Sequence, residues 1–204
     1  MSLDTAAAAA WLADFAAQVH DNAALLTDLD RQIGDADHGS NMDRGMQAVA
    51  ALSPDDFADA GAYLKKAGTT LVSTVGGASG PLYGTFLMRV GAAWPAEESA
   101  EGLGAALRAG LDGVLQRGKA SAGDKTMVDA LAPALEAYDA AAGEGVAAAL
   151  TAAAQACAAG RDATEAMVAR KGRASYLGER SAGVKDPGAT SVTYLVEAAA
   201  RTLA

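Results

Sequence analysis

The chain has 204 residues, 51% of them hydrophobic, and a formal net charge of −9 at pH 7. That composition excludes a disordered chain, and an acidic protein is not expected to grip nucleic acid or an anionic membrane, because both need a cationic footprint. The length suits one domain, which we expect to span residues 1–204.

The N-terminal segment, MSLDTAAAAAWLADF, has no basic region, and acidic residues interrupt its apolar run, so we expect no signal peptide. No window of ~18 uncharged apolar residues follows, so we expect no membrane span. The single cysteine, Cys157, allows no internal disulfide and suits a reducing compartment. We therefore expect a cytoplasmic protein in which Cys157 is a small buried side chain.

The elements expected along the chain are helices, because no convincing run of alternating β-branched residues is present. Apolar residues at i, i+4 and i+8, beginning with Trp11, predict a first amphipathic helix over about residues 4–30. Short connections are typical of antiparallel neighbours, so we predict an all-α, up-and-down bundle of roughly eight helices. The other helices are expected to carry Met46 and Val49, and to cover about 54–71, 81–93, 103–115, 124–141, a stretch from beyond Gly145 to 157 that continues over 161–169, and 188–204.

Polar residues and glycines are expected to mark the helix ends. Gly34, directly after Ile33, is expected to supply a left-handed cap at the end of the first helix. The candidate N-caps are Ser40, Asn41, Ser53 (which precedes Pro54) and Asp124.

Glycines gather at the junctions between these helices. Because alternate junctions of an up-and-down bundle share one end, we expect some of these loops to converge on one site. The five glycine-rich stretches are 34-GDADHG-39, 76-GGASGPLYG-84, 118-GKASAGDKT-126, 172-GRASYLGERSAG-183 and 186-DPG-188.

Three carboxylates crowd the first of these junctions, in 30-DRQIGDADHGSNM-42. Asp30 would oppose the dipole of its own helix, and Asp35 and Asp37 would repel one another without a cation. A set of oxygen ligands suits a hard cation, and Mg²⁺ fits better than calcium, because the spacing does not match an EF-hand, or zinc, which needs softer ligands. The alternative is a solvated acidic turn; we favour a magnesium site.

Three further stretches are candidates for binding phosphate. A helix that starts near Ser40 would point backbone N–H groups at an anion, and 76-GGASGPLYG-84 could do the same, although a tight helix–helix turn explains that loop equally well. The basic stretch 170-RKGRASYLGERSAGVKDPG-188 is either a solvated loop or a cationic lid over phosphates, and its length favours the lid. His38 is expected to orient ligands, and we find no candidate nucleophile.

Several motifs, taken together and in order, resemble the L subunit family of bacterial dihydroxyacetone kinases, which is the nucleotide-binding subunit. The resemblance runs from about Leu29 to the C-terminus and differs at Val184, where a histidine is expected. It implies an eight-helix antiparallel barrel with ADP or ATP and Mg²⁺ at one end. The motifs that carry it are GDADHGSNM, VGGASGPLYGTF, RGKASAGDKTM, ARKGRASYLGERS and DPGATS.

The resemblance also implies roles for individual residues. Asp30, Asp35 and Asp37 would hold two Mg²⁺ ions that bridge the phosphates. The implied nucleotide-binding residues are His38, Gly39, Ser40, Asn41, Ala78 and Ser79 at the phosphates, and Gly118, Met127, Arg173, Asp186, Pro187 and Gly188 around the base and ribose. Met127 is alternatively a core residue.

Partners are implied in the same way. An L subunit works with a K subunit that binds dihydroxyacetone, and a free-standing L chain favours recharging of the bound ADP by a phosphotransferase M subunit. The chain would be inactive alone. A kinase of another small ketose, such as erythrulose, and a non-catalytic magnesium or nucleotide sensor remain alternatives, and the sequence leaves open both the phosphoryl donor and whether the chain forms a homodimer.

Overall fold

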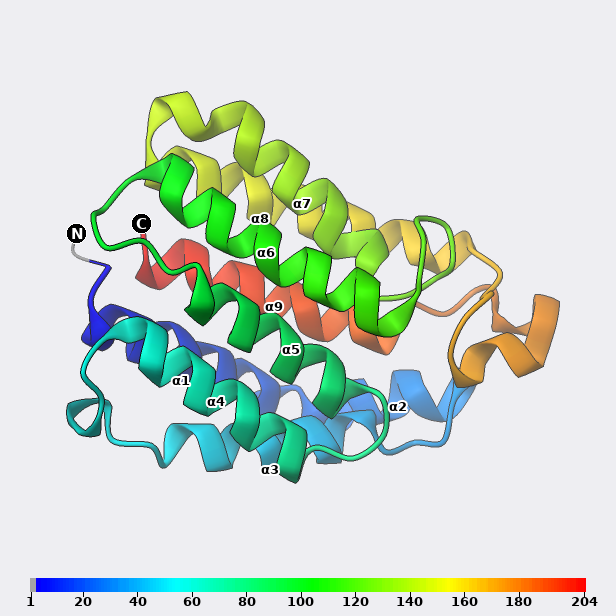
Figure 1. The fold of residues 1–204 in the computed structure, drawn as a ribbon. Helices are drawn as coiled ribbons and strands as arrows, with labels where there is room; N and C mark the ends of the chain where they lie inside the picture. Colours follow the sequence, from blue (N-terminus) through cyan, green and yellow to red (C-terminus); the bar gives the residue numbers. More distant parts are fainter. Residues whose placement is uncertain (1–2) are drawn as a thin grey trace.

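The structure is a computed structural model that describes residues 3–204 (Figure 1). Within that range the secondary structure is entirely helical, as predicted. The α-helices are α1 (Thr5–Asp21), α2 (Ala23–Ile33), α3 (His38–Ala50), α4 (Ala60–Thr74), α5 (Ser79–Ala92), α6 (Ala100–Gly118), α7 (Val128–Ala141), α8 (Val146–Ala163) and α9 (Pro187–Thr202). Short 3-10 helices cover Pro54–Asp56, Ala142–Glu144, Thr164–Ala166 and Arg173–Ser181.

The long helices form a closed ring. From α3 to α9, each helix packs against the next one in the chain, and α1 closes the ring by packing against both α9 and α3. Figure 1 shows α9 running between α1 and α8, with both chain ends at one end of the molecule. The opposite end carries α2 and the 3-10 helix Arg173–Ser181, so the ends of the bundle differ in character.

The core fills the interior of this ring with aliphatic and aromatic side chains. Trp11, Phe15, Tyr83 and Phe86 are almost completely buried, and α9 is buried along most of its length. The indole Nε1 of Trp11 donates a hydrogen bond to the carbonyl of Leu195 at 2.8 Å, which fastens α1 to α9 where the ring closes. No helix in the described part of the chain has the length and apolar character required to span a bilayer.

Glycines let α4 and α5 approach closely. A Cβ atom built on Gly84 would lie 2.6 Å from the carbonyl oxygen of Gly68, and one on Gly91 would lie 2.7 Å from that of Gly61. Both distances are too short for a real Cβ contact, so these positions admit no side chain without moving a helix. The close pair sets the position of α5, whose first turn lies at the end of the bundle that carries α2.

The first predicted helix, residues 4–30, is wrong as a single element. The structure divides it at Asn22, whose φ of −110° and ψ of 12° are not helical, and continues the second part to Ile33. The side-chain amide of Asn22 donates to the carbonyl of Gln18 at 2.9 Å, so the side chain competes with the backbone for a helical acceptor. The break redirects α2 toward the glycine-rich loops.

Two predicted helix starts are also wrong. Ser53 and Pro54 begin only the 3-10 helix Pro54–Asp56, and α4 starts at Ala60 with Asp59 as its N-cap, accepting from the amide of Ala62 at 2.7 Å. The short helix ends because the chain returns to extended backbone at Phe57.

Asp124 does not cap α7, which begins at Val128. The Asp124 side chain instead accepts from the amide of Ser121 at 2.8 Å and closes a turn. Asp129, in the first turn of α7, accepts from the amides of Gly123 and Thr126, which precede that helix, and no side chain caps α7 at its N-cap residue, Met127.

Three smaller expectations fail in the same way. Ser40 and Asn41 are not N-caps, because α3 starts at His38 and includes both residues. The Ser40 hydroxyl donates to the carbonyl of Asp37 and does not accept from a backbone amide, as a cap would. Gly34 ends α2 at a φ of −145°, so it is not a left-handed cap. The segment 161–169 is not one helix, since α8 ends at Ala163 and only a 3-10 turn follows.

Candidate functional site

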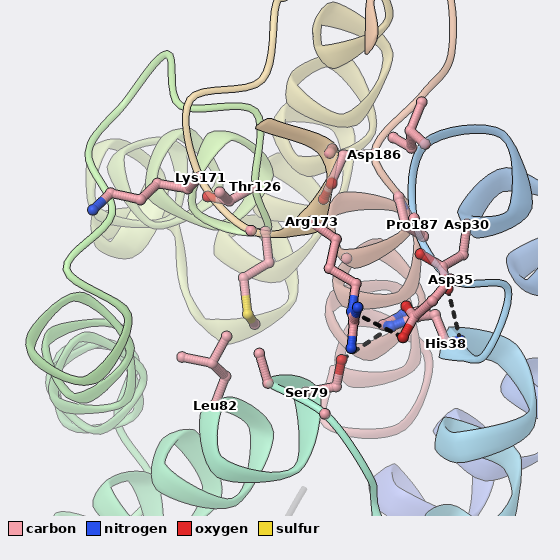
Figure 2. A pocket seen from close by; sticks show the side chains of 18 of the residues that line it. Asp30, Asp35, His38, Ser79, Leu82, Thr126, Lys171, Arg173, Asp186 and Pro187 are labelled. Carbon is pink, nitrogen blue, oxygen red and sulfur yellow. Dashed lines mark hydrogen bonds and ion pairs between the residues drawn. The ribbon is translucent and has the colours of Figure 1, made fainter. Parts of the chain in front are cut away.

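A cavity opens at the end of the bundle where five separate stretches of chain meet (Figure 2). Most of the residues singled out from the sequence line it, so the expected convergence of the glycine-rich loops is found at this end. The lining residues are Asp30, Ile33, Gly34, Asp35, Asp37, His38, Gly76, Gly77, Ala78, Ser79, Leu82, Tyr83, Lys125, Thr126, Met127, Lys171, Gly172, Arg173, Ala174, Asp186, Pro187 and Gly188.

The three aspartates of the acidic loop come together on one side of this cavity. One carboxylate oxygen from each of Asp30, Asp35 and Asp37 lies within 4.8 Å of the other two. Asp30 is 8% exposed, and its Oδ2 accepts from the amides of Asp37 at 2.8 Å and His38 at 3.1 Å. The carboxylate of Asp30 therefore folds the loop back on itself and brings the other two carboxylates toward it.

The backbone of this loop is shaped for that approach. A Cβ atom on Gly34 would collide with the carboxylate of Asp30, which explains the glycine even though its φ is not positive. Ala36, between the two outer aspartates, has a φ of 64°, a left-handed conformation that is uncommon for a residue with a side chain. Strain of this kind is concentrated where a loop must present particular side chains.

A basic residue reaches the aspartates from the opposite side of the cavity. Arg173 Nε lies 2.8 Å from Asp35 Oδ2, and Figure 2 shows its side chain pointing across the cavity toward Asp35. Arg173 comes from the basic stretch 170–188, so one salt bridge joins the acidic loop to that stretch. The planar guanidinium also has further N–H donors, which match the oxygens of a phosphate.

Three helices begin at the cavity. His38 starts α3, Ser79 starts α5, and Pro187 starts α9, and each of these residues lines it. A helix N-terminus carries a partial positive charge and orphan N–H groups, so three together favour an anionic ligand. The same end of the site therefore offers carboxylates to a cation and helix N-termini to an anion.

His38 is held at the centre of a buried hydrogen-bond network. Its Nδ1 lies 3.0 Å from Ser79 Oγ, and its Nε2 lies 2.8 Å from Ser191 Oγ, which in turn lies 2.7 Å from the Tyr83 hydroxyl. Burial lowers the pKa of His38 from 6.5 to about 4, opposed by the nearby Asp30 carboxylate, so the imidazole is neutral at neutral pH. The network links the first turns of α3, α5 and α9.

Asp186 caps the last helix from a buried position. Its Oδ2 accepts from the amide of Ala189 at 2.7 Å, as expected for an N-cap carboxylate. Burial raises the pKa of Asp186 from 3.8 to about 7, while the hydrogen bond from Ala189 and the charge of Lys125 lower it. Its neighbours Pro187 and Gly188 then pass directly along the cavity wall.

Four residues expected to contact a nucleotide lie apart from the rest. Within the described residues, Gly39, Ser40, Asn41 and Gly118 are not part of the cavity lining. Gly39 packs against the backbone of α2, Asn41 Oδ1 accepts from Arg44, and Ser40 is exposed on α3. Their roles in binding stay predictions.

Sequence reasoning missed several residues that build the site. Lys125 is 1% exposed, and its Nζ donates to the carbonyls of Met167, Ser181 and Val184. The sequence feature that could have identified Lys125 is its place directly after Asp124 in the glycine-rich stretch 118-GKASAGDKT-126. Tyr83 and Ser191 were missed because their buried hydroxyl groups pair across 108 positions of the sequence. The available signal for Ser191 was the polar stretch 190-TSVT-193 within an otherwise apolar helix.

Val184, which departs from the resemblance, lies in a small apolar cluster away from the main core. It packs with Ile33 at the end of α2 and with Ala169 and Ala174. The position therefore serves to attach the basic stretch to α2, and valine fills it with an apolar side chain.

The arrangement suits a hard cation and phosphate in contact with one another. Clustered carboxylates with no sulfur ligand match Mg²⁺, which binds through a few carboxylates and takes its other ligands from water and phosphate. Helix N-termini and Arg173 then face the anion that such a cation would accompany. The fold and the cavity together define an all-α bundle protein with clustered carboxylates and three helix N-termini around one cavity at its end.

The chain belongs to the DAK2 domain family, which matches residues 32–201. It is 50% identical over 177 residues to the "PEP-dependent dihydroxyacetone kinase, ADP-binding subunit DhaL" of Escherichia coli (strain K12), and the match covers 84% of each chain. It is 44% identical over 206 residues to the "PEP-dependent dihydroxyacetone kinase 1, ADP-binding subunit DhaL" of Listeria innocua, covering 99% of this chain and 98% of that one.

The fold is also found in a solved structure. The dihydroxyacetone kinase from C. freundii in complex with AMP-PNP and Mg²⁺ superimposes with a TM-score of 0.72 and 28% sequence identity. The match covers 96% of this chain but only 34% of that kinase, so the chain spans about a third of the longer protein. The resemblance inferred from the sequence motifs is therefore confirmed at the level of family and fold.

Proposed function

We propose that this chain is the nucleotide-binding subunit of a dihydroxyacetone kinase, and that it presents ADP or ATP with two Mg²⁺ ions to a separate sugar-binding K subunit. The observation that carries the proposal is the cluster of Asp30, Asp35 and Asp37, with carboxylate oxygens within 4.8 Å, in the same cavity as three helix N-termini. A free-standing cation site would not need those N-termini, and a free-standing anion site would not need the carboxylates.

Each group has a role in that function. The three aspartates would hold Mg²⁺, which would neutralise phosphate charge when bound. The first turns of α3 and α5, with Ser79 and neutral His38, lie against the phosphates, and Arg173 neutralises charge on them from the other side. Met127, Pro187 and Gly188 form the wall for the base and ribose.

We assign no side chain of the described site as a nucleophile. Phosphoryl transfer does not require one, since it depends on positioning and charge neutralisation rather than covalent catalysis by the protein. The acceptor sugar therefore has to be supplied from outside the cavity by the K subunit, and the chain is inactive alone. The Escherichia coli and Listeria innocua relatives are named PEP-dependent, which favours recharging of the bound ADP in place by a phosphotransferase M subunit.

The test begins with the nucleotide extracted from freshly purified protein, identified by mass spectrometry with and without EDTA treatment. We expect stoichiometric ADP that EDTA releases. Adding K and M subunits with a phosphoenolpyruvate-driven donor system should then convert dihydroxyacetone to its phosphate, and omitting this chain should stop the reaction. A protein that retains nucleotide but supports no transfer with any K subunit would be a sensor rather than a kinase subunit.

A further inference from the structure

The basic stretch over the cavity is a loop with a narrow base. We call residues 167–184 the lid segment; it contains the 3-10 helix Arg173–Ser181 and carries Arg173 to Asp35. At its base, the amide of Ala169 donates to Ser181 Oγ at 2.8 Å, so the two strands of chain are joined directly. Just outside the lid segment, the amide of Asp186 donates to Thr164 Oγ1 at 2.9 Å.

Lys125 lies at that base. Its Nζ is 3.1 Å from the carbonyl oxygen of Met167, 2.7 Å from that of Ser181 and 2.6 Å from that of Val184. These carbonyls come from both ends of the lid segment, so one ammonium group holds the chain where it leaves the bundle and where it returns. An ammonium has three N–H donors, and all three are used here.

The surroundings make this an unusual place for a lysine. The side chain is 1% exposed, and a buried ammonium is costly unless hydrogen bonds and opposite charges compensate. Burial lowers the pKa of the Lys125 ammonium, and the nearby Asp186 and Glu165 oppose that effect. Lys125 also has a φ of 63°, which turns its backbone into the left-handed region to aim the side chain at the lid base.

A lysine in a glycine-rich loop beside a phosphate site would ordinarily be assigned to the phosphate. The geometry excludes that role for Lys125, because its three donors are already bound to carbonyl oxygens. We propose that Lys125 is a positioning residue that fastens the lid segment at its base, and so sets how long the site retains a nucleotide. The proposal rests on the proposed function for the identity of the ligand, but the fastening is a property of the chain itself.

Two links carry the effect from Lys125 to the ligand. On one side, the lid segment presents Arg173 to the acidic loop at 2.8 Å. On the other, Met127, two residues along the chain from Lys125, also lines the cavity. A change at Lys125 would therefore alter the position of the lid segment without removing Arg173 or Met127.

The test compares Lys125→Met, which keeps the aliphatic length and removes the donors, with the wild-type protein. Limited trypsin digestion reports on the lid, which contains Arg170, Lys171, Arg173 and Arg180, and stopped-flow fluorescence of a labelled ADP with Mg²⁺ reports on dissociation. We expect cleavage within the lid and the ADP dissociation rate each to rise roughly tenfold or more, as for buried acceptors that lose a charged donor. Circular dichroism should show the same helix content.

Two controls separate positioning from general stability. Lys66→Met removes an exposed lysine on α4 and should leave both rates unchanged. Val49→Ala makes a cavity in the core at the opposite end of α3 from His38, so it should lower the melting temperature without changing ADP dissociation. Faster dissociation with an unchanged cleavage rate in Lys125→Met would mean direct contact with the phosphate and would overturn the proposal.

Wild-type protein supplies a test that does not depend on the variant folding or on any nucleotide. Hydrogen exchange should show the amides of Ala169 and Gly183, which donate to Ser181 Oγ and the carbonyl of Glu165, protected to a degree similar to helical amides of the bundle. Exchange at the rate of an open loop would refute a fastened lid. A protected lid base in a protein that binds no ADP would refute the proposed function instead.

Discussion

Asp30 has two tasks that a simple ligand would not have. It offers one carboxylate oxygen to the cluster with Asp35 and Asp37, and its Oδ2 accepts from two backbone amides of the loop that carries them. Those hydrogen bonds give the carboxylate of Asp30 two partners at the end of α2, where a negative charge opposes the helix dipole. Asp30, which the helix dipole disfavours at the end of α2, is therefore the residue whose hydrogen bonds hold the acidic loop in place.

Asp35→Asn should raise the Mg²⁺ concentration needed for half-maximal ADP binding on the order of tenfold or more, because the site loses a charged ligand and the partner of Arg173. Isothermal titration calorimetry at a series of Mg²⁺ concentrations measures this. Asp28→Asn is the matched control, since Asp28 is an exposed carboxylate on α2 that pairs with Arg31. An unchanged Mg²⁺ requirement in Asp35→Asn would remove Asp35 from the ligand set.

Cys157 should be inert in the native protein. Burial raises the pKa of its thiol from 9.0 to about 12, and the side chain lies against Thr193. A thiol reagent at pH 8 should therefore react only on unfolding. Because the folded-state pKa lies above the unfolded one, the thiol leaves stability unaffected below about pH 9 and lowers it as the pH rises from 9 toward 12. Rapid labelling without denaturant would contradict this.

At the scale of elements, the sequence was sufficient where a signal is local and periodic. The apolar stripe that starts at Trp11 identified a helix, and three aspartates within eight residues identified the acidic loop. Helix ends were less predictable, because several neighbouring polar residues can each cap an amide and only the fold decides between them. Asp59 caps α4 in place of Ser53, whereas Asp124 closes a turn and does not cap α7.

The parts of the site that could not be predicted depend on contacts between distant positions. Lys125 reaches Val184 across 59 residues, and His38 reaches Ser191 across 153. No periodicity or turn chemistry records such a pairing, since it exists only once the ring of helices has closed. The nucleotide-binding roles of Gly39, Ser40, Asn41 and Gly118 rest on the family resemblance and stay predictions.

Gly84→Ala should destabilise the protein by about 1–3 kcal/mol, because the new methyl group would meet the carbonyl of Gly68 at 2.6 Å and force α4 and α5 apart. Chemical denaturation monitored by circular dichroism gives the free energy of unfolding. Gly143→Ala is the control: a Cβ there meets open space, so a change within about 0.5 kcal/mol is expected. Equal effects at both positions would show that the close approach of the helices is not responsible.

At the scale of the whole molecule, the ring divides the protein into a structural end and a binding end. Figure 1 places both chain ends opposite the cavity, away from α2 and the lid segment. The structural end is closed by bonds such as that from Trp94 Nε1 to the carbonyl of Leu3 at 2.8 Å. The binding end is made of five separate stretches of the chain. A bound ligand that contacts several of them should therefore stabilise this end of the protein more than the other.

Adding ADP with Mg²⁺ should therefore raise the melting temperature by roughly 5–10 °C at about 100 times the dissociation constant, since the ligand binds only the folded protein. Differential scanning fluorimetry provides the measurement. EDTA should abolish the shift if the three aspartates hold the nucleotide through metal. A full shift that persists in EDTA would mean that ADP binds without the cation.

The spread of the cavity over the chain has a consequence for synthesis. A ribosome synthesises Asp30, Asp35 and Asp37 well before Arg173 and the start of α9. The acidic loop therefore exists before the cavity can form, and the cavity is complete only after the later segments have folded against the earlier ones.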